Sequence, residues 1–144
     1  MIFPAHQEAL IEGKAYRLLR ANVSATLDSF GISIPEWTLL GLLHDGGELM
    51  ASELADRLGV EAPLVTTLLK QLHEKNLLEL RAHPRDNRAK LAALSKKGKE
   101  AFQGIGQAVH QGLEPLMKGI TPGDIQAYFR VLEQILANGE GGSK

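Results

Sequence analysis

The sequence has no cysteine among its 144 residues. Disulfide bonds, thiolate metal sites and a cysteine redox switch are therefore all excluded. No apolar run approaches the length of a membrane-spanning helix. The first residues, MIFPAHQEAL, lack the charged and apolar regions of a signal peptide. We therefore expect a cytoplasmic protein, although the lack of cysteine does not by itself fix the compartment.

Residue patterns typical of enzymes and metal sites are also missing. None of the five histidines forms a pair at metal-ligand spacing beside a carboxylate, apart from the loose segment His44-Asp45-x-x-Glu48. There is no Ser-His-Asp order, no glycine-rich phosphate loop and no pair of carboxylates in a defined context. We expect no metal, no other cofactor and no enzyme, although a sequence does not show residues that meet only in space.

Positive charge is concentrated in one segment of a nearly neutral chain. The formal net charge is −1. Between residues 81 and 99 only Asp86 opposes a run of cations, which are Arg81, Arg85, Arg88, Lys90, Lys96, Lys97 and Lys99. A local basic face on a neutral molecule fits a docking patch for phosphate. The alternative is a solvated surface without a partner.

Apolar residues at helical spacing predict helices at both ends of the chain. The first covers residues 5–30 and ends at Gly31. Its apolar stripe is wide, which indicates burial on more than one side, as in a helix between subunits. Ser95 is placed to cap a helix over 96–117, and Thr121 begins another that carries apolar residues to Leu136. Four glycines within 96–117 cost about 1 kcal/mol each against alanine, so packing must hold that helix.

The central part of the chain begins with a capping box, Ser33-Ile34-Pro35-Glu36. The helix that it starts ends at His44, and its Trp37 is expected in the core. Two shorter helices follow, over about 52–58 and 62–75, with Gly59 in the turn between them. Met50 stands where a capping serine or threonine is expected, so the first of these is weakly capped.

The second short helix has two different faces. Its core stripe consists of Val65, Leu68, Leu69 and Leu72. The opposite face is small and polar, which suits a helix lying in a DNA major groove roughly 12 Å wide. After a stop at Asn76, apolar and polar residues alternate over 78–83, and 90–94 forms a return strand. The link 84–89 contains proline, aspartate and asparagine, which favour turns.

These features together resemble the MarR/SlyA family of bacterial transcriptional regulators, over about residues 10–136. The resemblance rests on Gly31-Ile32-Ser33 with Trp37-Thr38-Leu39-Leu40, on residues 54–59 (LADRLG) and on 72–78 (LHEKNLL). Its most specific part is Pro84-Arg85-Asp86-Asn87-Arg88 followed by Leu94-Ser95-Lys96-Lys97-Gly98. The implied fold is mainly α with a small β-hairpin wing. A winged helix-turn-helix over 33–95 would be embedded in a helical dimerisation frame, over 5–30 and 96–138, within a single domain 1–144.

The resemblance implies a homodimer that binds a palindromic operator in double-stranded DNA. The recognition helix would be 62–75 and the wing 77–94, with Arg88 in the minor groove. Asp86 would orient Arg88 or a neighbouring arginine through a charge-assisted bond. The expected DNA-binding residues are Ser52, Pro63, Thr66, Thr67, Lys70, Arg81, Arg85, Asp86, Arg88 and Lys90.

The chain departs from the family pattern at several positions. Pro63 stands where a serine is common, and Thr67 where an arginine is common. Asn87 replaces a frequent arginine in the wing, and Asn76 replaces the usual glycine after the recognition helix. With no arginine on this helix, we expect weaker binding or more dependence on DNA shape and on the thymine methyl group.

Many relatives bind small aromatic or lipophilic effectors between the dimer frame and the DNA-binding lobe. By resemblance, such a pocket would be lined by Tyr16, Arg20, Trp37, Leu40, Leu64 and His73. The alternative is a filled apolar core without a ligand. We predict a homodimeric DNA-binding repressor that a small molecule releases. The alternative function is a winged-helix module that binds protein, and the near-neutral charge and the missing helix arginine keep this alternative open.

Overall fold

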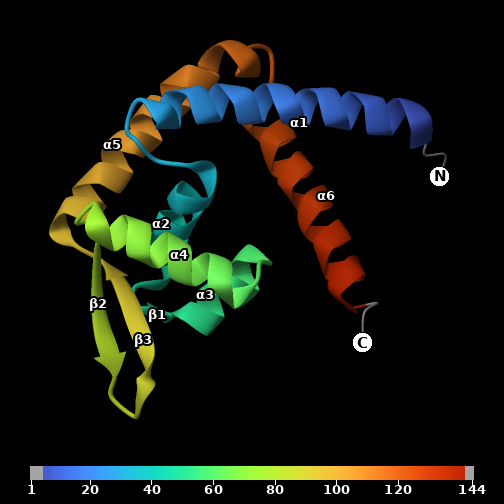
Figure 1. Ribbon diagram of the computed structural model, residues 1–144. Coiled ribbons are helices and arrows are strands. Elements are labelled where there is room, and N and C mark those ends of the chain that lie inside the picture. The colour runs from blue at the N-terminus through green and yellow to red at the C-terminus, as the bar shows by residue number, and fades with distance from the viewer. Residues whose placement is uncertain (1–4, 142–144) are drawn as a thin grey trace. The chain divides into compact units, whose positions relative to one another are not determined.

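The computed structural model describes residues 5–141 (Figure 1). Its elements are α1 (Ala5–Asp28), α2 (Ile34–Gly46), β1 (Leu49–Met50), α3 (Ala51–Leu58), α4 (Ala62–Glu74), β2 (Leu78–His83), β3 (Asp86–Leu94), α5 (Lys96–Leu113), the 3-10 helix η1 (Glu114–Met117) and α6 (Pro122–Gly141). The chain divides into two compact units, the first ending at Leu113 and the second beginning at Glu114. The predicted fold class, mainly helical with a small sheet, is confirmed.

Local signals end α1 and start α2 as the sequence predicts. Gly31 has a φ of +68°, a left-handed conformation that glycine adopts without strain. The Ser33 hydroxyl then accepts from the N–H of Glu36 at 3.2 Å, and the Glu36 carboxylate accepts from the N–H of Ser33 at 3.1 Å. The capping box therefore satisfies donors that the first turn of a helix otherwise leaves without partners.

The two helices α3 and α4 meet at a left-handed turn, as expected. Gly59 has a φ of +68°, and its N–H donates to the carbonyls at the end of α3. Met50 provides no side-chain cap for α3, but its N–H donates to the Glu53 carboxylate at 3.1 Å. After α4, Asn76 takes a φ of +63° and is the non-glycine residue with positive φ among those described. The chain thereby turns from α4 into β2.

The sheet has three antiparallel strands in the order β1-β3-β2. The sequence predicted a hairpin alone and missed β1, in which Leu49 pairs with Ala92 and Met50 with Leu91. A strand of two residues shows no periodicity in the sequence. β1 is recognised only because it pairs with the edge of β3 that β2 leaves free. The predicted link 84–89 is also wrong in extent. Asp86 already pairs with His83, so β3 begins at Asp86 and the turn is short.

Leucines from the short helices form the core of the first unit. Leu40 and Leu43 of α2, Leu54 of α3 and Leu72 of α4 are almost fully buried. The predicted stripe of α4 is buried throughout. Trp37 packs against this core but is only partly buried. The hairpin extends away from the helices (Figure 1), so the core holds one end of it and leaves its tip in solvent.

The helix predicted over 96–117 ends earlier, at Leu113, and continues as η1. Pro115 explains the correction, because proline disfavours α-helical geometry at the residue before it and lacks an N–H. In the second unit, Thr121 and Asp124 form reciprocal cap bonds of 3.1 and 2.9 Å. The α6 helix that follows has no buried residue of its own. No helix of the described residues is long and apolar enough to cross a membrane.

Candidate nucleic-acid interface

A groove of about 890 Å³ lies between α4 and the β2–β3 hairpin. Its polar lining residues come from α3, α4 and both strands, and are Ser52, Thr66, Lys70, His73, Arg81, Arg88 and Lys90. Among the residues that line it, none is an aspartate or glutamate. Six of the ten predicted DNA-binding residues therefore meet in one basic groove. A groove with cations and no carboxylate concentrates anions.

The outer face of α4 carries two further predicted residues. Pro63 and Thr67 are exposed, and they lie beside the groove and not among its lining residues. The Thr66 hydroxyl donates to the carbonyl of Ala62 at 3.2 Å. The Thr67 hydroxyl donates to the carbonyl of Pro63 at 3.1 Å. Both hydroxyl hydrogens thus point back to the helix that carries them.

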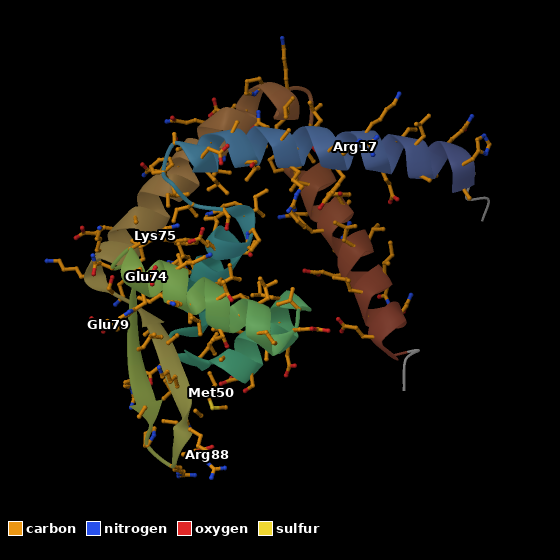
Figure 2. All side chains as sticks on the ribbon, viewed as in Figure 1. Arg17, Met50, Glu74, Lys75, Glu79 and Arg88 are labelled. Atoms are coloured by element: carbon orange, nitrogen blue, oxygen red, sulfur yellow. The ribbon has the colours of Figure 1, made fainter. Side chains whose placement is uncertain are left out.

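The remaining predicted residues lie at the tip of the wing. Arg85 is in the turn, and its N–H donates to Nδ1 of His83 at 3.1 Å. Arg88 is exposed near the tip, as Figure 2 shows. Ala82 pairs with Lys90 while the next residue, His83, pairs with Asp86, so 87–89 bulges out of the ladder. This bulge places Arg88 outside the regular strand.

Asp86 contacts the backbone of Arg88 and not its guanidinium. Its carboxylate accepts from the backbone N–H of Arg88 at 2.9 Å. No ion pair between Asp86 and an arginine side chain is present among the described residues. Asp86 is two residues before Arg88, so its short side chain reaches the N–H of that residue in a local turn. It shapes the backbone that carries Arg88 and leaves the guanidinium without a carboxylate partner.

Glu48 is a functional neighbour that the sequence analysis missed. It lies in the turn between α2 and β1, and its carboxylate forms an ion pair with the guanidinium of Arg81. Arg81 is therefore not a free cation of the groove, although its side chain is 57% exposed. The two residues are far apart in sequence and meet only because β1 joins the sheet. No local pattern could have indicated this pair.

An ion pair between a buried carboxylate and a partly exposed lysine holds the end of α4. The Lys75 ammonium donates to the Glu36 carboxylate at 2.6 Å and to the carbonyl of Gly31 at 2.7 Å. Burial raises the pKa of Glu36, but the hydrogen bonds from Lys75 and from Ser33 outweigh it, and the net pKa lies below its ordinary value. The end of α4 is thereby tied to the start of α2.

The structure does not bring together the six residues predicted for an effector pocket. Leu40 is buried in the core, and Trp37 packs against the core. Arg20 and Leu64 line a shallow groove beside α2, while His73 lines the basic groove. Tyr16 is exposed on α1, where its hydroxyl accepts from Arg20 at 3.1 Å. These residues come from three helices, and the packing of α1, α2 and α4 places them on different surfaces and in the core.

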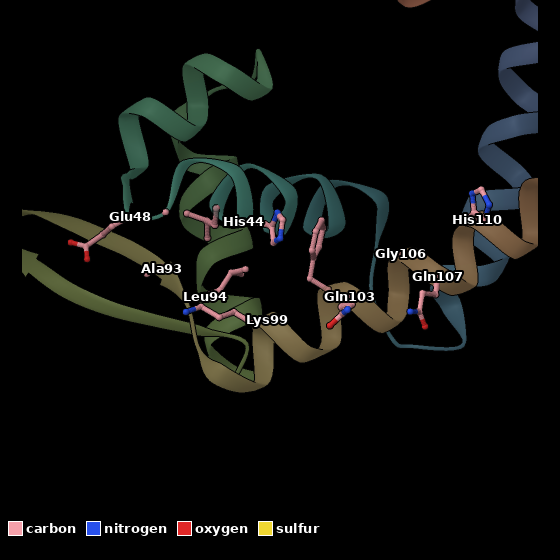
Figure 3. A pocket seen from close by; sticks show the side chains of 12 residues that line it. His44, Glu48, Ala93, Leu94, Lys99, Gln103, Gly106, Gln107 and His110 are labelled. Carbon is pink, nitrogen blue, oxygen red and sulfur yellow. The ribbon is translucent and has the colours of Figure 1, made fainter. Parts of the chain in front are cut away.

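A different cleft, of about 1030 Å³, lies between α2, β3 and α5 (Figure 3). Its floor is apolar and includes Leu43, Leu94 and Phe102. The His44 ring lies 4.7 Å from the Phe102 ring between centroids. The polar residues along this cleft are Glu48, Lys99, Gln103, Gln107 and His110. An apolar floor with a few polar groups at its rim is typical of small-molecule sites.

The weak metal pattern of the sequence does not become a metal site. His44 contacts the Asp45 carboxylate through Nδ1 at 3.1 Å. Among the described residues, no group of three or more histidines and carboxylates could hold a metal ion. The His44 pair lies at the surface beside the cleft.

Comparison with known proteins shows the fold and a partial match to one family. A sequence model of the MarR family matches residues 30–89. The HTH-type transcriptional repressor IacR of Pseudomonas putida is 22% identical over 136 residues, which cover 94% of this chain and 79% of IacR. The structure resembles AbsC, a MarR family transcriptional regulator from Streptomyces coelicolor, with a TM-score of 0.81 at 19% identity over 98% of both chains.

A further solved structure is that of Bordetella bronchiseptica BpsR, in work on how 6-hydroxynicotinic acid regulates its DNA binding. It matches with a TM-score of 0.78 at 18% identity, over 94% of this chain and 96% of that one. At these identities the structural likeness shows the fold alone. The family model adds a sequence match to the MarR family of transcriptional regulators over residues 30–89, and the solved structures of that family show the same winged-helix fold.

Proposed function

We propose that this protein is a homodimeric repressor that binds a palindromic operator in double-stranded DNA. The observation that carries the proposal is the groove between α4 and the wing. It contains four basic side chains, Lys70, Arg81, Arg88 and Lys90, and no carboxylate lines it. Such a surface on a chain of net charge −1 concentrates positive potential on one face.

The geometry fits the docking mode of a winged helix. The outer face of α4 would enter the major groove, and the wing would follow the backbone to the neighbouring minor groove. Arg88 is exposed near the tip and carries no carboxylate partner in the structure. An arginine so placed fits a narrow minor groove, where the potential is most negative.

Exposed apolar surface supports a second copy of the chain as the partner. On α1 the residues Leu10, Ile11 and Leu18 are each more than half exposed. In the second unit, α6 exposes apolar residues along its length, which are Tyr128, Phe129, Val131, Ile135 and Leu136. Apolar surface of this extent marks an interaction site. A symmetric dimer would cover it and place two recognition helices about one turn of DNA apart.

The test is binding to DNA from upstream of the protein's own gene, at 50 and 200 mM salt. Each of the two copies would bring Lys70, Arg88 and Lys90 to the phosphates, in addition to Arg81, which is paired with Glu48. Contacts to about six to ten phosphates predict a loss of 10³- to 10⁵-fold in affinity over this salt range. Arg88→Ala should lose about 1–3 kcal/mol of binding free energy while the dimer persists.

The matched control is Arg17→Ala, which removes an equally exposed arginine from α1, outside the groove. It should bind DNA as the unchanged protein does. If no genomic fragment binds with a steep salt dependence, the remaining alternative is a winged-helix module that contacts a protein. Binding that persists unchanged in Arg88→Ala would remove the wing from the interface.

We place the effector site in the cleft between α2, β3 and α5, and no longer at the six residues expected from the sequence. Phe102 and His44 offer ring surfaces, and Lys99 offers an ammonium without a carboxylate partner in the structure. This combination suits a small aromatic acid. Glu48 lines the cleft and pairs with Arg81 of the basic groove, so a ligand that displaces Glu48 also changes the DNA-binding surface. A ligand acts only through different affinities for the two states.

The effector proposal is tested with two probes, benzoate and 6-hydroxynicotinate, the second being the compound reported for BpsR. Bound probe should lower DNA affinity and change the fluorescence of Trp37, the single tryptophan. Lys99→Met should weaken probe binding much more than DNA binding. DNA binding that both probes leave unchanged at millimolar concentration would remove them as effectors and leave the operator proposal standing.

A further inference from the structure

The start of the recognition helix presents an uncharged face rich in methyl groups. Ala62, Pro63, Thr66 and Thr67 are all exposed there, at positions that share one side of α4. The charged residues nearest this face are Glu61, which precedes the helix, and Lys70, one turn further on. The base edges of a major groove would meet the uncharged face first if α4 enters by its N-terminal half.

The threonine hydroxyls on this face cannot donate to a base as they stand. A hydroxyl has one hydrogen, and those of Thr66 and Thr67 are given to the carbonyls of Ala62 and Pro63 at 3.2 and 3.1 Å. In threonine the hydroxyl and the methyl group both branch from Cβ. With the hydroxyl bonded to the helix carbonyl, the methyl group is the branch left for contact with DNA.

The backbone at the helix start adds few donors to this surface. Pro63 has no N–H. The N–H of Leu64 donates to the carbonyl of Glu61 at 3.1 Å. Guanine presents two hydrogen-bond acceptors, N7 and O6, in the major groove, and this face has few free donors for them. Thymine instead offers a methyl group, which an apolar surface contacts favourably.

We propose that Thr66 and Thr67 recognise thymine methyl groups, so that each half-site carries A·T pairs beneath the first turns of α4. The inference rests on the proposed DNA binding and names the bases that this face selects. Lys70 lies one turn later, where its ammonium contacts phosphate or a base outside the two threonine positions. Burying one methyl group contributes roughly fourfold in affinity.

The experiment begins with selection of bound duplexes from a randomised DNA pool by the full-length protein. Each thymine of the selected site is then replaced by deoxyuridine, which lacks only the 5-methyl group. Replacement at a contacted position in both half-sites should weaken binding roughly fifteenfold, from about fourfold per methyl. Replacement at positions outside the recognition helix is the control and should leave binding unchanged.

Two double variants separate the methyl groups from the hydroxyls. Thr66→Val with Thr67→Val keeps the shape and the methyl groups, and should bind the selected site within about twofold of the unchanged protein. Thr66→Ser with Thr67→Ser keeps only the hydroxyls and should lose affinity. In the serine variant deoxyuridine should no longer weaken binding, because the contacting methyl group is already missing.

The outcomes distinguish this inference from the function on which it rests. A selected site with guanine beneath the threonines, indifferent to deoxyuridine and weakened by the valine variant, would overturn the inference and leave DNA binding intact. An essential cytosine contacted by Glu61 would overturn it as well. Failure of every duplex to bind would instead reject the proposed function.

Discussion

Gly98 offers a direct test of the packing that holds the recognition helix. It is buried in the first turn of α5, and its N–H donates to the Ser95 hydroxyl at 2.9 Å. A Cβ added to Gly98 would lie 2.0 Å from the carbonyl oxygen of Leu77 and 3.0 Å from its carbon. The new Cβ would meet backbone atoms of Leu77, so no side-chain rotation can relieve the contact.

Gly98→Ala should therefore destabilise the protein, although alanine is the better helix former. Overpacking of this kind costs about 1–3 kcal/mol. The same carbonyl of Leu77 accepts from the N–H of Ser95 at 3.0 Å, and displacing it would weaken a bond worth about 1 kcal/mol. Against this stands a gain of about 1 kcal/mol in helix propensity. The net loss expected is about 2 kcal/mol.

Gly104→Ala is the matched control in the same helix. A Cβ at Gly104 meets nothing within 4 Å, so the same substitution should stabilise by up to about 1 kcal/mol. Both variants are compared with the unchanged protein by urea unfolding at one protein concentration, since the midpoint of a dimer depends on concentration. A Gly98→Ala protein that unfolds at the same or a higher urea concentration than the unchanged protein would refute the reasoning.

Two ion pairs lead to further predictions. Because its folded-state pKa is lowered, Glu36 contributes stability above its ordinary pKa of 4.5 and loses it as the pH falls through the folded value. Glu36→Gln should lower the free energy of unfolding by about 1–3 kcal/mol at pH 7, measured by urea titration. Below pH 4.5 the variant should lose stability less steeply than the unchanged protein. The same pH dependence in both proteins would contradict this. Glu48→Gln should release Arg81 for contact with phosphate and raise DNA affinity by up to about fivefold per chain in a binding titration. Reduced affinity would show instead that the ion pair positions Arg81 for binding.

The turns between the helices from Gly31 to Asn76 could be predicted because local residues set them. The capping box of Ser33 and Glu36, the left-handed turns at Gly31 and Gly59, and the stop at Asn76 all depend on groups within a few residues of one another. The buried stripe of α4 likewise follows from the 3.6-residue period. The groove residues of α4 and the wing were expected from the family resemblance.

The sequence by itself thus determined the fold class, the order of elements and the basic segment, since those depend on local geometry and composition. Only the tertiary structure decided which distant residues meet. It added the strand at Leu49–Met50, paired Glu48 with Arg81 and Glu36 with Lys75, and placed Gly98 against the backbone of Leu77. It also placed the six residues expected around an effector on different surfaces and in the core, and formed a separate cleft between α2, β3 and α5. Such contacts join residues far apart in the chain, and a one-dimensional pattern carries no information on how turns bring them together.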